Sequence, residues 1–322
     1  MSELKSRFDA AAADSKRLPE APSNNAKLKL YGLFKQGSAG DATGARPGIA
    51  DAVGRAKHDA WAAVKGTPAE EAMRQYIDLV ESLRRTATEE RLLVSREDWT
   101  AARIEVLAEE KALMRQADAI AAKRRAMPWT LVEKSYVFDA PEGRVTLSDL
   151  FAGRGQLAVY HFMFGPDWKQ GCHRCSFWAD NFDGIDVHLA HRDTTFIAAS
   201  NTSREKIDAY KARMGWRFKW VSALGGDFNR DFHVSFAQAE LDAGDAYYNF
   251  QKKSPFLAEM QGLSVFAKLA DGRIAYTYST YARGIDVFNG AYQILDLTPK
   301  GRDEGAAADP MFWLKRHDEY AS

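Results

Sequence analysis

The sequence predicts a two-domain protein in which an all-α four-helix bundle is followed by an α/β domain. Residues 1–86 show only the three- and four-residue spacing of apolar side chains that is typical of amphipathic helices. Residues 95–322 alternate short, β-branched apolar runs with helical segments, which favours a sheet with helices packed against it. Residues 87–94 lose the apolar period and are expected to form the linker. The length of 322 residues suits two domains of about 150 residues each.

The overall composition excludes several classes of protein. The chain has 44 Lys and Arg against 44 Asp and Glu, so no global attraction to nucleic acid or to an anionic membrane is expected. No stretch approaches the roughly 20 apolar residues that span a bilayer, and the N-terminus lacks the apolar core of a secretory signal. We therefore expect a cytoplasmic protein with no transmembrane segment and no nucleic-acid partner. Two cysteines are too few for a disulfide scaffold.

The first domain is expected to contain four helices. The first covers about residues 4–15 and is ended by two prolines. Ser23 provides an N-cap for the second, which continues through Lys35. The third covers about residues 49–64, and the fourth begins after the cap Thr67. These helices can form a bundle around one small core.

Some residues of this bundle do not suit a core. Tyr31, Phe34 and Lys35 lie three and four residues apart and share a helix face, and Lys57 and Tyr76 lie within the next two helices. Such aromatic rings and lysines suit a ligand that has a flat ring and phosphates, because rings stack and lysines act as point charges on phosphate oxygens. The alternative is that the aromatic residues edge the core and the lysines are solvated.

The first domain resembles the acyl-CoA-binding protein family. The matching runs cover nearly the whole domain: residues 22–24, 29–36 (KLYGLFKQ), 40–41, 46–48, 54–61, 65–66, 71–73, 76–77 and 80. The resemblance implies a four-helix fold that binds a long-chain fatty acyl-CoA. It implies that Tyr31 stacks on the adenine, that Lys35 and Lys57 bind the 3′-phosphate, and that Lys16 and Tyr76 also belong to the site.

Two positions depart from the pattern of that family. Phe34 stands where many members have tyrosine, which removes a hydroxyl group and keeps the ring. His58 stands where tryptophan is common, which makes the surroundings of Lys57 more polar. Either change can lower the affinity or alter the preferred chain length of the acyl group.

A long charged helix is expected to begin the second domain. Ser95 can cap it, an apolar pattern continues from Trp99 to Ile120, and Pro128 ends it. We expect this helix to be an arm packed on the second domain. A coiled coil is less favoured, because a strict heptad does not hold.

The second domain shows strands and helices in alternation. A hairpin with a short helix after it is expected over residues 136–149, and the late hairpin over residues 263–278 has Asp-Gly at its turn. Between them lie expected strands at residues 156–164, 194–199 and 220–224 and a helix at residues 203–214. This order predicts an α/β sheet with mixed strand directions, thioredoxin-like and close to the peroxiredoxins in segment lengths.

Cys172 and Cys175 follow the strand at residues 156–164 and a loop rich in Gly and Pro, and a helix can begin at Ser176. This arrangement is typical of thioredoxin-like redox sites. A helix N-terminus favours thiolate over thiol, so Cys172 is expected to attack and Cys175 to resolve. His173 and Arg174 between them can stabilise the thiolate, which favours an oxidising pair.

The second domain also resembles a bacterial thioredoxin-like family catalogued as domain of unknown function 899. The matching runs are residues 94–99, 160–168, 171–181, 226–229, 244–249, 278–284 and 317–320. The resemblance implies the fold and thiol redox chemistry without a substrate. Thioredoxins place a cis-proline before the strand that faces the two cysteines, whereas here Gly262 begins that segment. A small-molecule or peroxide substrate is therefore favoured over a protein disulfide.

Other residues can support this site or offer a different one. Trp168 belongs to an aromatic group that is mostly core and can also line an apolar entry for an acyl chain. Arg283 can bind an anion near the thiols, or it can be a surface or bracing residue. The two cysteines with His188 and His191 approach the spacing of a zinc finger, although the last gap is one residue short. The thiols can also be inert and buried.

The sequence therefore predicts a protein that binds long-chain fatty acyl-CoA and carries a thiol site for disulfide or peroxide chemistry, with a thiol reductant as a possible partner and no cofactor. The first alternative is a non-enzymatic acyl-CoA carrier or sensor with a thioredoxin-like scaffold. A zinc site is the second.

Overall fold

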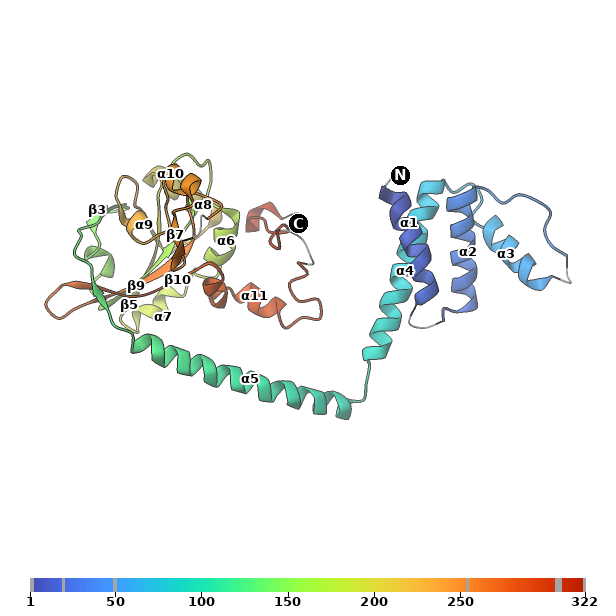
Figure 1. Ribbon diagram of the computed structural model, residues 1–322, viewed down its shortest axis with the longest axis horizontal. Coiled ribbons are helices and arrows are strands. Elements are labelled where there is room, and N and C mark those ends of the chain that lie inside the picture. The colour runs from blue at the N-terminus through green and yellow to red at the C-terminus, as the bar shows by residue number, and fades with distance from the viewer. Residues whose placement is uncertain (1–2, 19–20, 49–50, 253–254, 305–308, 321–322) are drawn as a thin grey trace. The chain divides into compact units, whose positions relative to one another are not determined.

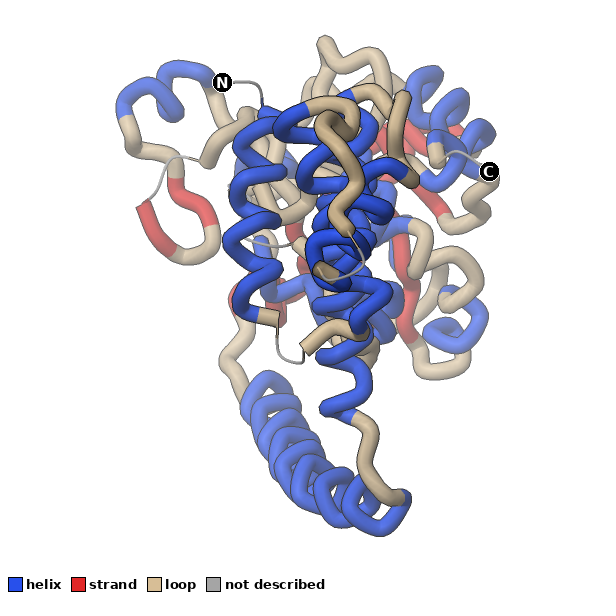
Figure 2. The backbone as a smooth tube through the Cα atoms, turned by 90° about the vertical axis from the view of Figure 1, so that its right-hand side faces the viewer, coloured by secondary structure: helices blue, strands red, loops and turns tan. Residues whose placement is uncertain are grey.

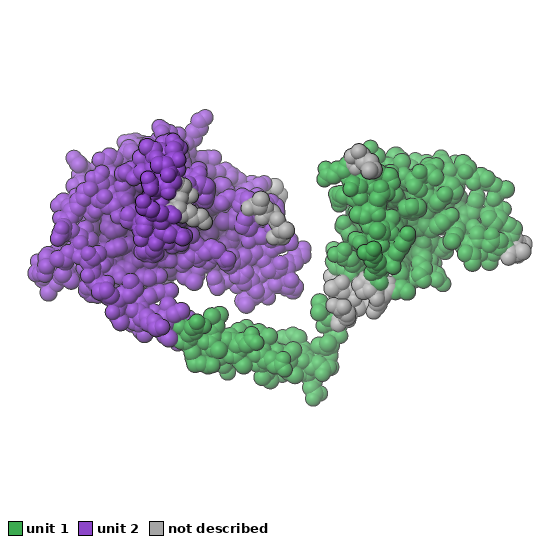
Figure 3. Space-filling model, in the orientation of Figure 1, with its two compact units in different colours: residues 1–116 green, residues 117–322 purple. Residues whose placement is uncertain are grey.

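The computed structural model describes residues 3–18, 21–48, 51–252, 255–304 and 309–320, without the side chains of residues 87–91. The chain divides into two compact units, Met1–Gln116 and Ala117–Ser322 (Figure 3). Each unit is described by itself below.

Unit 1 is a small helical bundle (Figure 1). Its helices are α1 (Glu3–Asp14), α2 (Asn24–Ala39), α3 (Ala52–Ala62) and α4 (Ala69–Leu92), with a 3-10 turn at Ser15–Arg17 after α1. The side chain of Ser23 accepts a hydrogen bond from the Ala26 amide at 3.2 Å, which confirms the expected N-cap of α2. The core joins residues from α1, α2 and α4, among them Phe8, Leu33, Ala72, Tyr76, Ile77 and Val80.

The helices between the units differ from the expectation. α4 continues through Leu92, so most of the expected linker at residues 87–94 is helical. α5 follows as Arg96–Arg125, and the Ser95 hydroxyl caps it by accepting a hydrogen bond from the Asp98 amide at 3.0 Å. No residue of α5 is buried, and the expectation that this helix packs on the second domain stays a prediction. Its many Ala, Glu, Lys and Arg residues favour a helix without help from a core.

Unit 2 is built on an eight-stranded mixed sheet, whose strands are among the red segments of the tube in Figure 2. The strands are β1 (Thr130–Leu131), β2 (Val137–Ala140), β3 (Gly143–Thr146), β4 (Gln156–His161), β5 (Thr194–Ser200), β6 (Lys219–Ser222), β9 (Gly262–Lys268) and β10 (Ile274–Tyr281). Their order is β1-β10-β9-β4-β5-β6-β2-β3. β4, β5 and β6 are parallel, and β9 is antiparallel to both β4 and β10.

This topology is thioredoxin-like. The β4–α6–β5 crossover joins two parallel strands, and the β9–β10 hairpin extends the sheet from the other side of β4. The hairpins and strands expected from the sequence are confirmed. Outside the sheet lie a small hairpin of β7 (Tyr247–Tyr248) and β8 (Gln251–Lys252) and the helices α6 (His173–Ala179), α7 (Asp186–Ala190), α8 (Arg204–Met214), α9 (Phe228–Asp231), α10 (Gln238–Ala243) and α11 (Gly290–Leu295). Short 3-10 turns lie at Asp149–Phe151, Ala282–Phe288 and His317–Glu319.

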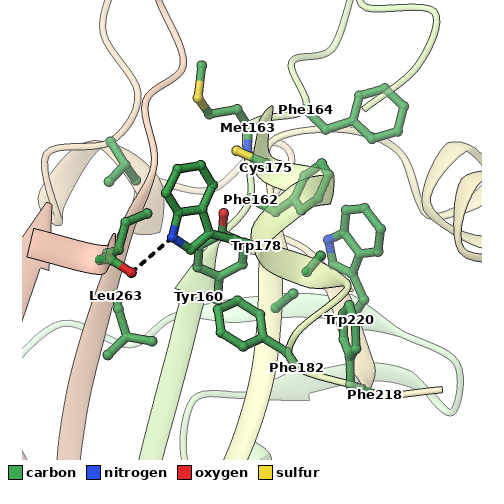
Figure 4. Packing of buried hydrophobic residues seen from close by; sticks show 14 of the residues in the cluster. Tyr160, Phe162, Met163, Phe164, Cys175, Trp178, Phe182, Phe218, Trp220 and Leu263 are labelled. Atoms are coloured by element: carbon green, nitrogen blue, oxygen red, sulfur yellow. Dashed lines mark hydrogen bonds between the residues drawn. The ribbon is translucent and has the colours of Figure 1, made fainter. Parts of the chain in front are cut away.

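The sheet has a hydrophobic cluster on each face, because successive side chains of a strand point to opposite sides. Along β4, Leu157 and Val159 join the cluster that contains Phe266, whereas Tyr160 joins the cluster that contains Trp178. Figure 4 shows the second cluster, in which Tyr160, Phe182 and Trp178 pack together. In the described part of the chain, no helix has both the length and the apolar character needed to cross a membrane.

Candidate ligand and thiol sites

The first candidate site lies on one face of α2 and α3 in unit 1. The Lys57 Nζ atom lies 5.4 Å from the centre of the Tyr31 ring, and the Lys35 Nζ atom lies 4.6 Å from the centre of the Trp61 ring. The structure thus brings together the three residues expected for a nucleotide and adds Trp61, which was not expected as a site residue. Its position four residues after Lys57 on the same helix is the signal that could have indicated it.

A second group of rings lies between α1, α2 and α4. Phe34 stacks on Phe8 with ring centres 5.5 Å apart, and its ring centre lies 5.9 Å from that of Tyr76. Tyr76 is 4% exposed and its hydroxyl donates to Ser15 Oγ at 3.0 Å, next to the exposed Lys16. Tyr76 therefore belongs to the core, and only its hydroxyl end faces the end of α1.

The loop between α2 and α3 is tied to both helices. The buried Gln36 donates from Nε2 to Asp41 Oδ1 at 2.8 Å and to the Thr67 carbonyl at 2.7 Å. The Trp61 indole donates to the Gly40 carbonyl at 2.8 Å. A hydrogen bond from the Gly66 amide lowers the pKa of Asp41, which keeps this carboxylate ionised as an acceptor. These bonds hold Trp61, whose ring faces Lys35, against α2.

The second candidate site lies where α6 begins. Cys172 is the N-cap residue and is half-buried, and Cys175 is fully buried in the first turn. The Cys172 amide donates to the Met163 carbonyl at 3.1 Å, and the Met163 amide lies 3.4 Å from Cys175 Sγ. Figure 4 shows Cys175 and Met163 side by side. The end of β4 is thus joined directly to the two thiols.

The two thiols differ in acidity. A hydrogen bond from the Cys175 thiol, aided by the amides of Cys175 and Arg174, lowers the pKa of Cys172 to about 7. Burial raises the pKa of Cys175 well above its ordinary value. As the pH rises, Cys172 therefore loses its proton before Cys175 does. Such a difference is what an attacking thiolate and a resolving thiol require.

Gln261 contacts the buried thiol and was not expected from the sequence. Its Oε1 atom accepts from Cys175 Sγ at 3.6 Å and from the Tyr160 hydroxyl at 3.4 Å. The Tyr248 hydroxyl fixes the Gln261 carbonyl at 2.8 Å. Gln261 directly precedes β9, where thioredoxins place their cis-proline, and the described backbone has no cis peptide bond. A hydrogen-bonding side chain therefore occupies the place expected for a substrate-holding proline.

Arg316 is a buried cation behind the thiol loop. Its Nη2 atom donates to the Gly171 carbonyl at 2.6 Å, and its Nε atom donates to the Tyr210 hydroxyl at 2.7 Å. That hydroxyl lies 2.8 Å from Ser176 Oγ, which donates to the Cys172 carbonyl at 2.9 Å. Arg316 thus restrains the peptide groups on both sides of Cys172. Because 145 residues separate Arg316 from Gly171, this contact could not be predicted from the sequence.

The supporting residues expected from the sequence have varied surroundings. Burial lowers the pKa of His173, so this side chain is neutral at pH 7. Arg174 donates to Asp309 Oδ2 at 2.6 Å and is therefore already ion-paired. Trp168 is half-buried, and its carbonyl accepts from Lys206 Nζ at 3.1 Å. Arg283 has an 88% exposed side chain that donates to Asp286 Oδ2 at 3.2 Å.

His188 lies in the middle of the short helix α7 and His191 directly after it, and both are exposed. Over the residues that the structure describes, no group of three or more His, Cys, Asp or Glu side chains is placed to hold a metal ion. The structure therefore does not bring the two histidines to Cys172 and Cys175, and it gives the zinc alternative no support.

A buried carboxylic acid lies at the same edge of the sheet as the thiol loop. Glu259 is 5% exposed, and its carboxyl group accepts from Ser235 Oγ at 2.5 Å and from Asn201 Nδ2 at 2.8 Å. Burial raises the pKa of Glu259 to about 7. Its Cγ atom lies 3.3 Å from the position of a Cβ atom built on Gly165, in the loop that leads to Cys172.

Two family models match the chain. Residues 88–320 match "Bacterial protein of unknown function (DUF899)", and residues 5–80 match "Acyl CoA binding protein". Acyl-CoA-binding domain-containing protein 1 of Oryza sativa subsp. japonica is 51% identical over 80 residues, which are 25% of this chain and 88% of the relative. Acyl-CoA-binding protein homolog 1 of Caenorhabditis elegans is 50% identical over 76 residues, which are 24% of this chain and 88% of the relative.

Solved structures resemble each part of the chain. Acyl-CoA-Binding Protein 2 of Oryza sativa is 45% identical and matches 27% of this chain and 96% of its own, with a TM-score of 0.26. Peroxidoxin BcpB of Mycobacterium tuberculosis is 12% identical and matches 52% of this chain and 96% of its own, with a TM-score of 0.36.

Proposed function

Because the chain belongs to the acyl-CoA-binding protein family over residues 5–80 and to the DUF899 family of bacterial proteins of unknown function over residues 88–320, we propose that unit 1 binds a long-chain fatty acyl-CoA. The observation that carries the proposal is the pairing of Lys57 with Tyr31 and of Lys35 with Trp61 across α2 and α3. Adenine can stack on the Tyr31 ring while the two ammonium groups bind phosphate oxygens.

The charge of the two lysines is available to a ligand. Within the described residues, neither Lys35 nor Lys57 forms an ion pair with a carboxylate, and each faces a ring instead. A phosphate can therefore bind without first displacing a competing anion. The acyl chain would lie against the apolar part of the bundle, where Phe34 exposes 37% of its surface beside Phe8.

Titration calorimetry with palmitoyl-CoA tests this site. We expect saturable binding to the full chain, weakened at least about 100-fold in Lys35→Ala with Lys57→Ala, because each charge-assisted hydrogen bond is worth about 1.5–3 kcal/mol. Lys111→Ala removes an exposed lysine of α5 and should leave binding unchanged. Absence of saturable binding, or an affinity unaffected by the double substitution, would contradict the proposal.

We further propose that Cys172 is the nucleophile of a thiol redox reaction on a small molecule, such as a lipid hydroperoxide. The Cys172 thiolate attacks the terminal peroxide oxygen, the O–O bond breaks, and the alcohol leaves with a proton. The resulting sulfenic acid reacts with the Cys175 thiol, which forms a disulfide and releases water. An external dithiol then reduces this disulfide and is itself oxidised. The lowered pKa of Cys172 beside the protonated Cys175 supports these roles.

Cumene hydroperoxide with dithiothreitol as the reductant tests this reaction. We expect turnover in the full chain, none in Cys172→Ser, and a sulfenic acid that reacts with dimedone in Cys175→Ser. Turnover that survives Cys172→Ser would disprove the role of this thiol. An inert Cys172 with an ordinary pKa would instead favour the acyl-CoA carrier or sensor, in which unit 2 is a scaffold.

A further inference from the structure

A cavity of about 550 Å³ in unit 2 lies beside β1 and the hairpin of β7 and β8, and we call it the aromatic cavity. The side chains that line it include six Phe and Tyr rings, those of Tyr136, Phe232, Tyr247, Phe250, Tyr276 and Tyr281. The size lies within the usual range for small-molecule sites, which are mostly apolar with a few polar groups. Neither thiol lines it, and all its lining residues belong to unit 2.

The rings meet edge to face. The Phe232 and Tyr276 ring centres are 5.0 Å apart at 69°, and those of Phe250 and Tyr281 are 5.6 Å apart at the same angle. His233 contacts Tyr247 in the same way at 4.9 Å. An edge-to-face contact uses the face of only one ring of each pair. Tyr247 and Phe250 are 40% and 64% exposed, so ring surface remains open to a ligand.

Phe250 is held at the cavity by an unfavourable backbone. It is the second residue of the two-residue turn between β7 and β8, where Asn249 has φ of 51° and Phe250 has φ of 63°. Such a turn normally has Gly at this position, because a Cβ atom is crowded in the left-handed region. The exposed ring recovers little of this cost through burial. Strain of this kind gathers at ligand sites.

The polar groups of the cavity are net negative. Lys134 Nζ lies 2.9 Å from Asp231 Oδ2 and is also paired with Asp227, which does not line the cavity, so two carboxylates share one ammonium. Glu133 adds another negative charge. Burial lowers the pKa of His233, which is therefore neutral at pH 7. An anionic ligand is disfavoured here, whereas a cation is attracted by both the carboxylates and the ring faces.

We propose that the aromatic cavity binds a compact organic cation whose alkylated ammonium head lies among the rings. This site is separate from the acyl-CoA and thiol sites and does not depend on either activity. Phe250 supplies the outer ring wall, and the acidic groups around Lys134 provide the long-range attraction.

Choline and its uncharged analogue 3,3-dimethyl-1-butanol test the proposal, because the two have nearly the same shape. Saturation-transfer NMR on their methyl protons is measured with the full chain. We expect choline to bind at least 10-fold more tightly than the alcohol. Equal binding of the two, or no binding of choline, would overturn the assignment.

Phe250→Gly separates the role of the ring from that of the backbone. Glycine suits the turn, so we expect the melting temperature of unit 2 to rise by about 2–4 °C while choline binding falls at least 10-fold. Phe256→Gly removes a different ring, 71% exposed and outside the cavity, and should leave choline binding unchanged. If Phe250→Gly keeps the affinity for choline, the ring is not part of the site and the proposal is wrong.

Discussion

Glu259→Gln should remove a pH dependence from the stability of unit 2. Burial raises the pKa of Glu259 from its ordinary value of 4.5 to about 7. The folded protein therefore holds the proton more tightly than the unfolded chain, and the stabilisation from this group is fully present below pH 4.5. This stabilisation is lost as the pH rises through about 7. The folded state must then either bury a charged carboxylate or hold a proton that the unfolded chain has already released.

The magnitude follows from the two pKa values. Their difference corresponds to about 3 kcal/mol at about 1.4 kcal/mol per pH unit. Glutamine is neutral at every pH and retains an oxygen that can accept from Asn201 and Ser235. We therefore expect the variant to match the natural protein near pH 4.5 and to exceed its free energy of unfolding by about 2–3 kcal/mol at pH 8.

Urea unfolding of the full chain at pH 4.5, 6 and 8 measures this difference, with the fluorescence of buried tryptophans such as Trp220 reporting on unit 2. Other titrating groups cancel in the comparison of the two proteins. Glu109→Gln on α5 alters an exposed carboxylate and should show no such divergence. If the difference between the natural protein and Glu259→Gln does not change with pH, Glu259 is ionised in the folded state and the reasoning is refuted.

Three further predictions concern the thiol site and unit 1. The rate of Cys172 alkylation by iodoacetamide should have its midpoint near pH 7. Cys175→Ala should raise that midpoint, because it removes the hydrogen-bond donor to Cys172. An unchanged midpoint would show that Cys175 does not lower the pKa of Cys172. Arg316→Gln should lower the free energy of unfolding of unit 2 by about 2–3 kcal/mol in urea, since buried partners lose a charged donor. The same substitution should also alter the pH midpoint of Cys172 alkylation. If Arg316 only stabilised the fold and did not act on the thiol, that midpoint would stay unchanged. Gly32→Ala should lower the stability of unit 1 by about 1–3 kcal/mol and weaken palmitoyl-CoA binding. The reason is that the new Cβ atom would lie 2.3 Å from the Ala60 carbonyl oxygen and separate α2 from α3. An unchanged calorimetric affinity would show that binding does not need the spacing of these helices.

The sequence by itself determined the features that depend on neighbouring residues. The cap at Ser23 and the hairpin turn at Asp271-Gly272 follow from local hydrogen bonds and backbone preferences, whereas α6 begins at His173, three residues before the start expected at Ser176. The division into a helical and an α/β part follows from the change in the spacing of apolar residues. The same reasoning did not show that residues 87–92 of the expected linker are helical, because the loss of an apolar period does not end a helix whose residues favour helix without burial.

Only the tertiary structure decided which distant residues meet at each site. Lys35 faces Trp61 from another helix, Gln261 contacts Cys175 from the position just before β9, and Arg316 binds the loop before Cys172 although 145 residues separate it from Gly171. No spacing rule relates such partners, because their contact depends on how the helices and strands pack. The raised pKa of Glu259 also depends on packing, because the segments around it remove its carboxyl group from water. The residues next to Glu259 in the sequence do not indicate that burial.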